Sequence, residues 1–361
     1  MAINKQRIIG FDLARAYAIL GMFIVNYNIV FGNFENKTGL GYFLSMFSGN
    51  SSTVFVMLAG MGLALMSNRN DYNSAEKSRL RNNILKRALF LFVLGILLQT
   101  FWPADILHFY AAYMSVGACI IFLNRKFYLW ISGAAVAIFH ILFFLIPFDT
   151  YWNFETFEYN HFWTFSGFLT NYLYNGWNAV FPWLAFFTTG MYLGRLNWQH
   201  PKTHKRIFVI GLALYLVVLL VQILANAFSR NIQFLELINA DYLPPMLPFI
   251  LSTTGFGFML IAAFMYLGNL TEYKKWAKNI AAVGQMTLTH YILHLTLGLF
   301  LFAGIFGKDL TTELADKNYI APEFILIFSL AYFIFSILLT KIWKQKFKNG
   351  PFEALMRKVS G

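Results

Sequence analysis

The sequence predicts an all-α, polytopic integral membrane protein with about ten transmembrane helices and both termini in the cytoplasm. Hydrophobic residues make up 58% of the 361 residues and charged residues only 12%, against roughly 25% charged in soluble domains. Apolar runs long enough to cross a bilayer recur along the chain. The net charge of +12 follows from basic loops between spans, so we expect no nucleic-acid partner.

Ten apolar runs account for the predicted spans. They cover roughly residues 8–32, 42–67, 87–102, 105–123, 127–148, 178–196, 207–228, 246–269, 279–306 and 322–343. The third and fourth runs are short and nearly continuous, which predicts a tight helical hairpin. The first run follows the basic residues Lys5 and Arg7 and has no small-residue cleavage site after it, which favours a retained span over a removed signal peptide.

The basic residues predict the orientation. With the N-terminus inside, 23 of the 28 Lys and Arg residues fall in inner segments, and only Lys37, Arg230, Lys308 and Lys317 fall in outer loops. Cytoplasmic loops of membrane proteins carry this excess, so we expect a multi-pass protein of the bacterial cytoplasmic (inner) membrane. Without an evident internal repeat, we divide the chain into one membrane domain, 1–343, and a basic interfacial tail, 344–361.

Two segments outside the spans have a distinctive composition. The outer segment 149–177 holds twelve Phe, Trp or Tyr residues, which favours an interfacial helix at headgroup level; the alternative is an aromatic lid over a substrate entrance. The tail is basic with Trp and Phe interspersed, and we expect a surface helix that begins at Pro351 and lies on the anionic inner leaflet.

The first span carries three polar side chains. Arg15 and Asn26 are eleven residues apart, close to three helical turns and about 16 Å of rise, so both project from one face. Asp12 precedes Arg15 by one turn, which suits a structural ion pair because an isolated Arg in a membrane is costly. In the alternative interpretation, Arg15 faces an internal cavity and binds an anionic ligand such as a phosphate.

Asp105 and His108 form a second polar pair, one helical turn apart after Pro103. Asp105 suits a helix N-cap. An aspartate in this position also suits the orientation of His108 as a general base. The sequence leaves both roles open.

A third pair, His290 and His294, lies in "VGQMTLTHYILH", within an apolar run without charges. The two imidazoles either bond to neighbouring helices or line a functional site. If this helix enters near Asn279, His290 lies about 16 Å deep and His294 about 22 Å deep. His294 then lies at a depth comparable with that of Asn26 and His108. Two histidines without a nearby acidic or cysteine ligand do not make a metal site, so we expect no metal.

Five stretches carry a family resemblance: "RIIGFDLARAYAILGMFIVNY", "ADILHFYAAYM", "FPWLAFFTTGMYLGRL", "VGQMTLTHYILH" and "FKNGPFEALMRKVSG". Their order and spacing resemble the bacterial YeiB-like membrane proteins, a family labelled as a domain of unknown function. That family belongs to a group of transmembrane acyltransferases that includes the heparan-alpha-glucosaminide N-acetyltransferase and bacterial O-acyltransferases of surface sugars. The resemblance covers essentially the whole chain, and its "GQMTLT-Y" and "GP-E---R" elements are the most specific.

The chain departs from these patterns at the expected catalytic positions. The Arg-x10-His motif of the O-acyltransferases corresponds to Arg15 and Asn26, so an asparagine replaces the histidine. The heparan enzyme resembles Arg-x10-Asn but uses a histidine in the next outer loop, and "NIVFGNFENKTG" contains none. His290 stands where the YeiB-like pattern more often has Asn, and His294 where it has Gln. The resemblance therefore leaves His108, His290 and His294 as replacement candidates.

The resemblance implies a membrane acyltransferase that moves an acyl group, in the first place acetyl, from cytoplasmic acyl-CoA to a hydroxyl or amine of an extracytoplasmic sugar or lipid-linked glycan. The expected co-substrate is acetyl-CoA or another acyl-CoA, and the expected partners are the sugar or glycolipid acceptor and the bilayer; a homodimer is left open. The alternatives are a small-molecule or lipid transporter that uses the same polar chamber, and a non-catalytic family member.

The candidate site residues fall into two groups. The catalytic candidates are His108 or His294 as general base, Asp105 to orient His108, and Asn26 as a hydrogen-bond donor to the oxyanion. For binding the acyl-CoA, we expect its phosphates near Arg15 and near a basic loop that contains Arg81, Lys86 and Arg87. His290 is expected to flank the route of the acyl donor.

Overall fold

A computed structural model of the chain describes residues 8–33, 36, 38–68, 71–272, 274–308 and 319–361. Most of these residues are helical, and the β structure among them is a hairpin of β1 (Trp152–Asn153) and β2 (Glu158–Tyr159). The structure confirms an all-α, polytopic membrane fold. Lys5, Arg7, Lys37 and Lys317, which enter the orientation argument, lie outside the described residues.

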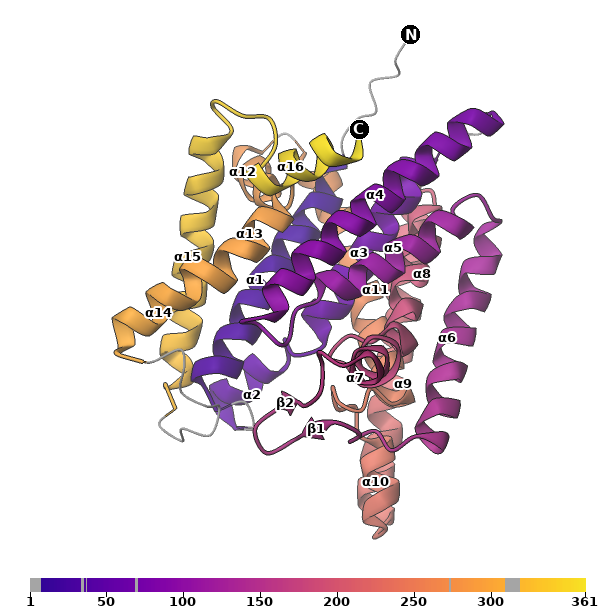
Figure 1. Cartoon of the computed structure of the whole chain (residues 1–361), viewed down its shortest axis with the longest axis vertical. Coiled ribbons are helices and arrows are strands. Elements are labelled where there is room, and N and C mark those ends of the chain that lie inside the picture. The colour runs from indigo at the N-terminus through magenta and orange to yellow at the C-terminus, as the bar shows by residue number, and fades with distance from the viewer. Residues whose placement is uncertain (1–7, 34–35, 37, 69–70, 273, 309–318) are drawn as a thin grey trace.

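The described residues of the first half of the chain form nine helical elements. They are α1 (Ile9–Phe31), α2 (Gly39–Ser45), α3 (Asn50–Met66), α4 (Ser74–Gln99), α5 (Leu107–Ile120), α6 (Arg125–Leu145), α7 (Phe165–Thr170), the π-helical turn η1 (Asn171–Asn175) and α8 (Val180–Gly194). Helix α1 packs against α3, and α8 lies between α3 and α6. Helices α4 and α5 form the expected hairpin (Figure 1).

The helices of the second half complete the bundle. They are α9 (Pro201–Phe228), α10 (Ile232–Ile238), α11 (Leu247–Thr271), α12 (Lys275–Val283), α13 (Thr287–Leu293), the π-helical turn η2 (His294–Gly298), α14 (Leu299–Phe306), α15 (Pro322–Trp343) and α16 (Pro351–Ser360). Helices α9 and α11 pack along each other, and α11, α12 and α15 all contact α1. The first span therefore contacts elements from both halves of the chain: α2, α3, α11, α12, α13 and α15.

Within the described residues, eight helical segments are long and apolar enough to cross a membrane. They are Ile9–Phe31, Gly39–Met66, Ser74–Gln99, Arg125–Leu145, Pro201–Phe228, Leu247–Thr271, Thr287–Phe306 and Pro322–Trp343. The other two predicted runs contain α5 and α8, which have only 14 and 15 residues. Every predicted run thus contains a helix, while the count of ten spans and the cytoplasmic termini stay predictions.

The two ends of the bundle differ. Helices α12 and α16 and the first turns of α4 lie at one end, and the β1–β2 hairpin and α10 lie at the opposite end (Figure 1). The basic inner segments of the sequence belong to the first of these. We call it the inner end, and the opposite one the outer end.

The ninth predicted run is not one continuous helix. Helix α12 ends at Val283 and α13 begins at Thr287, with Met286 between them outside helical geometry (φ −119°, ψ 37°). Gly284 packs so closely on α1 that a Cβ would lie 1.9 Å from the carbonyl oxygen of Asp12. His290 therefore lies about 4.5 Å from the start of its helix. The assumption of one continuous helix from Asn279, on which the expected depths rest, is wrong.

The third predicted run begins earlier than expected. Helix α4 starts at Ser74 because Asn73 and Glu76 form a capping box: the Asn73 side chain accepts from the Glu76 backbone, and the Glu76 side chain accepts from the Asn73 backbone. This arrangement satisfies two backbone donors at the helix start. The residues Arg81, Lys86 and Arg87, interpreted as a basic loop, are helical.

The outer segment 149–177 is not a single interfacial helix, so that interpretation is wrong. It folds as the β1–β2 hairpin followed by α7 and η1. Asn175 holds it together: its amide donates to the carbonyls of Phe148 and Thr150 and accepts from the hydroxyl of Tyr159. Trp152 also donates to the Asn175 backbone. These bonds fix an aromatic cap over the outer end of the bundle.

The orientation can be tested by labelling single cysteines. In a Cys119→Ser background, Lys202→Cys should be unreactive toward a membrane-impermeant thiol reagent in intact cells, whereas Trp163→Cys should react, since Trp163 is 67% exposed in the outer segment. Permeabilised cells provide the control for accessibility. Labelling of Lys202→Cys without permeabilisation would reverse the predicted orientation.

Candidate active site

Asn26 of α1 and His294 of η2 are joined by a hydrogen bond. Asn26 Nδ2 lies 2.8 Å from His294 Nε2, and His294 Nδ1 lies 3.2 Å from the backbone oxygen of His290. A carbonyl oxygen can only accept, so Nδ1 carries the proton and Nε2 accepts from the Asn26 amide. The expected proximity of Asn26 and His294 is present, and in this tautomer His294 fixes the orientation of the amide.

A π-helical turn supports this histidine. Turns of this kind interrupt the regular backbone bonding of a helix and often occur at functional sites. The hydroxyl of Tyr332 on α15 donates to the carbonyl of Leu293 at 3.0 Å, and the hydroxyl of Thr296 donates to Ile292 at 2.9 Å. These side chains provide donors for backbone carbonyls beside His294, so the turn is held from both α15 and its own helix.

Asp105 and His108 are fully buried and form the expected pair. Asp105 Oδ2 lies 3.0 Å from His108 Nδ1 and also accepts from the backbone amides of Leu107 and His108. The carboxylate thus accepts from the first two backbone amides of α5 and orients the imidazole at once, although Ile106, and not Asp105, holds the N-cap position. His108 Nε2 is buried without a hydrogen-bond partner among the described residues.

The outer aromatic segment covers this imidazole. The His108 ring lies 6.1 Å from the ring of Phe162 and 6.0 Å from the ring of Tyr172, measured between centroids. Burial raises the pKa of Tyr172 to about 12, so this phenol stays neutral. The position of the segment favours the lid interpretation, because it closes the outer side of the Asp105–His108 pair.

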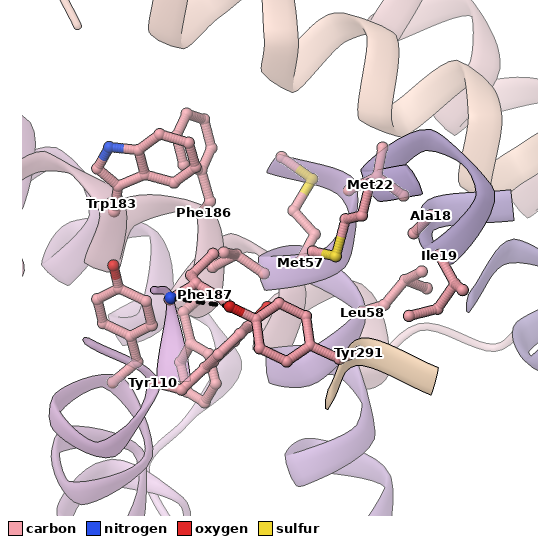
Figure 2. Packing of buried hydrophobic residues seen from close by; sticks show 14 of the residues in the cluster. Ala18, Ile19, Met22, Met57, Leu58, Tyr110, Trp183, Phe186, Phe187 and Tyr291 are labelled. Carbon is pink, nitrogen blue, oxygen red and sulfur yellow. Dashed lines mark hydrogen bonds between the residues drawn. The ribbon is translucent and has the colours of Figure 1, made fainter. Parts of the chain in front are cut away.

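Tyr291 was not among the residues selected from the sequence. It lies on the helix that continues into His294, and it contacts the Asp105–His108 pair. Its hydroxyl donates to Asp105 Oδ1 at 3.0 Å and accepts from the backbone amide of Ile106 at 3.3 Å. Figure 2 shows Tyr291 among the buried side chains of the core. Tyr291 precedes His294 by three residues and therefore shares its helix face. Its partner Asp105, in the connection between α4 and α5, cannot be read from that spacing.

A small cavity separates the side chains of Asn26 and Tyr291. Its volume is about 50 Å³, enough for a few water molecules. The described residues that line it are Met22, Val25, Asn26, Ile29, Ser48, Gly49, Ser52, Ala104, Ile106, Trp177, Asn178, Tyr242 and Tyr291. His294, His108 and Asp105 are not among these described lining residues. His294 bonds to Asn26, and His108 bonds to Asp105, which accepts from Tyr291.

A much larger pocket of about 680 Å³ opens at the outer end and shares Ser48, Trp177 and Tyr242 with the small cavity. Its described wall combines aromatic rings with amides and hydroxyls. The aromatic residues are Tyr42, Phe157, Trp177, Tyr215, Tyr242 and Phe249; the polar ones are Ser45, Ser48, Asn50, Gln222, Asn226, Asn239, Asp241, Ser252 and Thr253. Flat apolar surfaces with a few hydrogen-bonding groups are typical of small-molecule sites.

Tyr242 stands where the two spaces meet. Its hydroxyl accepts from the side-chain amide of Asn178 at 2.9 Å. Burial raises the pKa of Tyr242, although the bond from Asn178 lowers it in part. The phenol therefore keeps its proton at neutral pH and can donate toward the pocket.

His290 has a partner on a neighbouring helix. Its Nε2 lies 2.7 Å from the hydroxyl of Thr340 on α15, and the residue is 1% exposed. This contact fits the interpretation in which an intramembrane histidine holds two helices together. It gives no support to the expected position of His290 on an acyl-CoA route.

Arg15 lies between α1 and α3. Its guanidinium carbon lies 4.2 Å from the centre of the Phe11 ring, and its terminal nitrogen lies 2.8 Å from where a Cβ on Gly62 would be. Asp12 accepts from the side chain of Gln285 at 2.9 Å, and Lys344 donates to the same glutamine. Asp12 therefore takes part in a network that ties α1 to the inner ends of α13 and α15.

The three basic residues of α4 do not form one group. Arg81 lies over the ring of Phe122, Lys86 lines an inner surface pocket beside the C-terminal Gly361, and Arg87 donates to Ser360 of α16. Residues five and six positions apart project from different sides of a helix. These three residues therefore do not converge on one point of the helix surface, and their expected role near the acyl-CoA phosphates stays a prediction.

The C-terminal helix α16 begins at Pro351 as expected, but it docks on the bundle through a buried carboxylate. Glu353 accepts from the backbone amides of Leu288 and Thr289 at 2.8 and 3.1 Å and from the Thr289 hydroxyl at 2.6 Å. These are the free donors at the start of α13, where negative charge is favourable. The two most specific elements of the family resemblance are thus in direct contact.

Comparison with known proteins adds three findings. Residues 7–221 match the family described as heparan-alpha-glucosaminide N-acetyltransferase, catalytic. Residues 193–361 match the family described as protein of unknown function, DUF418. The uncharacterized protein YxaH of Bacillus subtilis (strain 168) is 23% identical over 204 residues, which cover 54% of this chain and 44% of that protein. The matched region therefore spans less than half the length of this relative.

Proposed function

The chain belongs to the family of the heparan-alpha-glucosaminide N-acetyltransferase catalytic domain, and on that premise we propose that it is an acyltransferase of a bacterial cytoplasmic membrane. It transfers an acyl group, in the first place acetyl, from cytoplasmic acyl-CoA to a hydroxyl or amine of an extracytoplasmic sugar or lipid-linked glycan. The reaction takes place in the cavity between Asn26 and Tyr291.

One observation carries this proposal. Asn26 and Tyr291 face the same small cavity, each held by a buried histidine-containing group, and that cavity meets the large outer pocket at Trp177 and Tyr242. Acyl transfer needs a donor to the developing oxyanion, a route for the acceptor's proton, and an acceptor held beside the thioester. The small cavity and the outer pocket together offer one feature for each of these requirements.

Asn26 suits the role of oxyanion donor. One N–H of its amide is committed to His294, and the second remains available toward the cavity. When an acceptor oxygen attacks the thioester carbon, the carbonyl oxygen becomes negative and this N–H stabilises it. His294 then acts as a positioning residue, since its Nε2 holds the amide and does not line the cavity.

The outer pocket suits the acceptor. Sugar rings present apolar faces and many hydroxyls, and the aromatic and amide groups of this wall complement both. Asp241 is the charged side chain among the described lining residues, so the wall is unfavourable for a phosphate within the pocket itself. The acceptor hydroxyl would approach the thioester past Trp177 and Tyr242.

Arg15 is proposed to bind the acyl-CoA at the inner half of α1. Arg15→Ala is expected to weaken coenzyme A binding by about 1.5–3 kcal/mol, the scale of a charge-assisted hydrogen bond, while the protein stays monodisperse. Isothermal titration of the purified protein measures this, with the solvent-facing Lys341→Ala as control. Aggregation of Arg15→Ala, or unchanged affinity, would favour a structural role at the α1–α3 contact.

The proposed function is tested by coenzyme A binding to native protein in detergent or nanodiscs. We expect saturable binding of coenzyme A and acetyl-CoA, because an acyltransferase requires this donor. A transporter that uses the outer pocket, or a non-catalytic family member, requires none. Absence of binding at millimolar coenzyme A would refute the acyltransferase assignment.

A further inference from the structure

The hydroxyl of Tyr291 lies between a cavity and a buried carboxylate. It donates to Asp105 Oδ1 and accepts one backbone bond from Ile106. A phenol oxygen has two lone pairs, so one remains for a group within the cavity that Tyr291 lines. The phenol is therefore placed to accept a proton on one side while it gives its own on the other.

Asp105 is the endpoint of this path. Its Oδ2 is occupied by two backbone amides and by His108 Nδ1, all within 3.2 Å, whereas Oδ1 receives the bond from Tyr291. Asp105 and His108 are both fully buried, and the aromatic segment covers them on the outer side. Neither residue is among the described residues that line the cavity, and the hydrogen bond from Tyr291 connects the pair to it.

The other groups around the cavity are less suited to this role. His294 Nε2 is occupied by the Asn26 amide. Tyr242 is bonded to the amide of Asn178, which cannot take up a proton at neutral pH. Of the two tyrosines among the described lining residues, Tyr242 and Tyr291, Tyr291 is the one that donates to a carboxylate.

We propose that Tyr291 is a catalytic residue that conducts the acceptor's proton to Asp105; this inference rests on the proposed acyltransferase function. The acceptor oxygen attacks the thioester carbonyl carbon and a C–O bond forms. Its proton passes to the Tyr291 oxygen, and the Tyr291 proton passes to Asp105 Oδ1. On collapse of the tetrahedral intermediate the C–S bond breaks, and the proton returns through Tyr291 to the leaving thiolate, which gives coenzyme A and the acylated acceptor.

The role of His108 in this path is to position the carboxylate. Its Nδ1–H donates to Asp105 Oδ2, which keeps Oδ1 turned toward Tyr291. His108, a candidate general base from the sequence, is thus a positioning residue: it acts through Asp105 and does not touch the substrate.

The test compares two buried tyrosines: Tyr291, which lies on α13, and Tyr332 of α15, which contacts α13. Tyr291→Phe removes the proton path and keeps the ring, and we expect kcat for acyl transfer to fall by roughly 100- to 10,000-fold, the usual range for general acid–base catalysis, with KM for acetyl-CoA unchanged. Tyr332→Phe removes a hydroxyl that donates to the carbonyl of Leu293, and we expect less than a tenfold loss, the scale of one structural hydrogen bond. The assay uses acetyl-CoA and a panel of simple glycosides.

A second variant keeps the inference falsifiable if Tyr291→Phe folds poorly. Asp105→Asn retains an oxygen that can accept from the first backbone amides of α5 but removes the carboxylate that receives the proton. Residues that act in one path are non-additive, so the double variant should lose no more activity than the more impaired single variant. Equal, small losses in Tyr291→Phe and Tyr332→Phe would overturn the inference alone, whereas an inactive native protein would refute the proposed function.

Discussion

Asn26→Ala is expected to lower the rate of acyl transfer by roughly 100- to 1,000-fold, the usual cost of removing one oxyanion donor. Coenzyme A binding should stay within a factor of about three, because the ground-state carbonyl needs this donor far less than the transition state does. The rate of coenzyme A release from acetyl-CoA, with the acceptor panel present, measures the effect. Asn28→Ala is the matched control, since Asn28 is buried on the same helix and is absent from the described cavity wall.

His294→Gln distinguishes two roles for His294, positioning of the Asn26 amide and general base. A glutamine oxygen can accept from the Asn26 amide as Nε2 does, so a positioning role predicts a loss of at most about tenfold, the scale of one altered hydrogen bond. A general base at His294 predicts a loss as large as that of Asn26→Ala, because glutamine cannot take up a proton. The geometry favours the smaller loss.

Glu353→Ala is expected to destabilise the protein by about 3 kcal/mol, the upper end of the range for hydrogen bonds to a charged group. The variant leaves the amides of Leu288 and Thr289 and a hydroxyl without their buried acceptor at the start of α13. Thermal unfolding followed by intrinsic fluorescence should show a Tm lower by about 4 °C. Glu323→Ala is the control, because Glu323 lies in the first turn of α15 but is exposed.

This destabilisation should reach the active site. Helix α13 carries His290 and Tyr291 and continues into His294, so loss of its cap loosens the groups that face Asn26. We expect Glu353→Gln, which retains acceptor capacity, to keep most of the stability. Equal Tm values for native protein and Glu353→Ala would show that α16 docks without contributing to the fold.

The spans were predictable because the bilayer imposes a direct signal on sequence. A segment that crosses hydrocarbon must be apolar over its length, and all ten predicted runs contain helix. The break between α12 and α13 was missed because hydropathy does not record backbone interruptions. Gly284 is the local signal, but its reason is the close contact with α1, which the sequence does not show.

The site was predictable where partners are close in sequence. Asp105 and His108 lie one turn apart, so their contact follows from helix geometry. Tyr291 was missed because its partner Asp105 lies 186 positions away. The basic residues Arg81, Lys86 and Arg87 were interpreted as one group because the start of α4 was placed too late, so their different helix faces were not considered.

Inverted membrane vesicles, whose cytoplasmic face is outward, test the central claim most directly because they supply the natural acceptors. Vesicles from cells that produce the native protein are incubated with [14C]acetyl-CoA, washed and extracted. The account predicts that label accumulates in lumenal or glycolipid material of native vesicles and falls to background in vesicles with Asn26→Ala at matched protein levels. Equal labelling of the two vesicle preparations would contradict acyl transfer at the cavity between Asn26 and Tyr291.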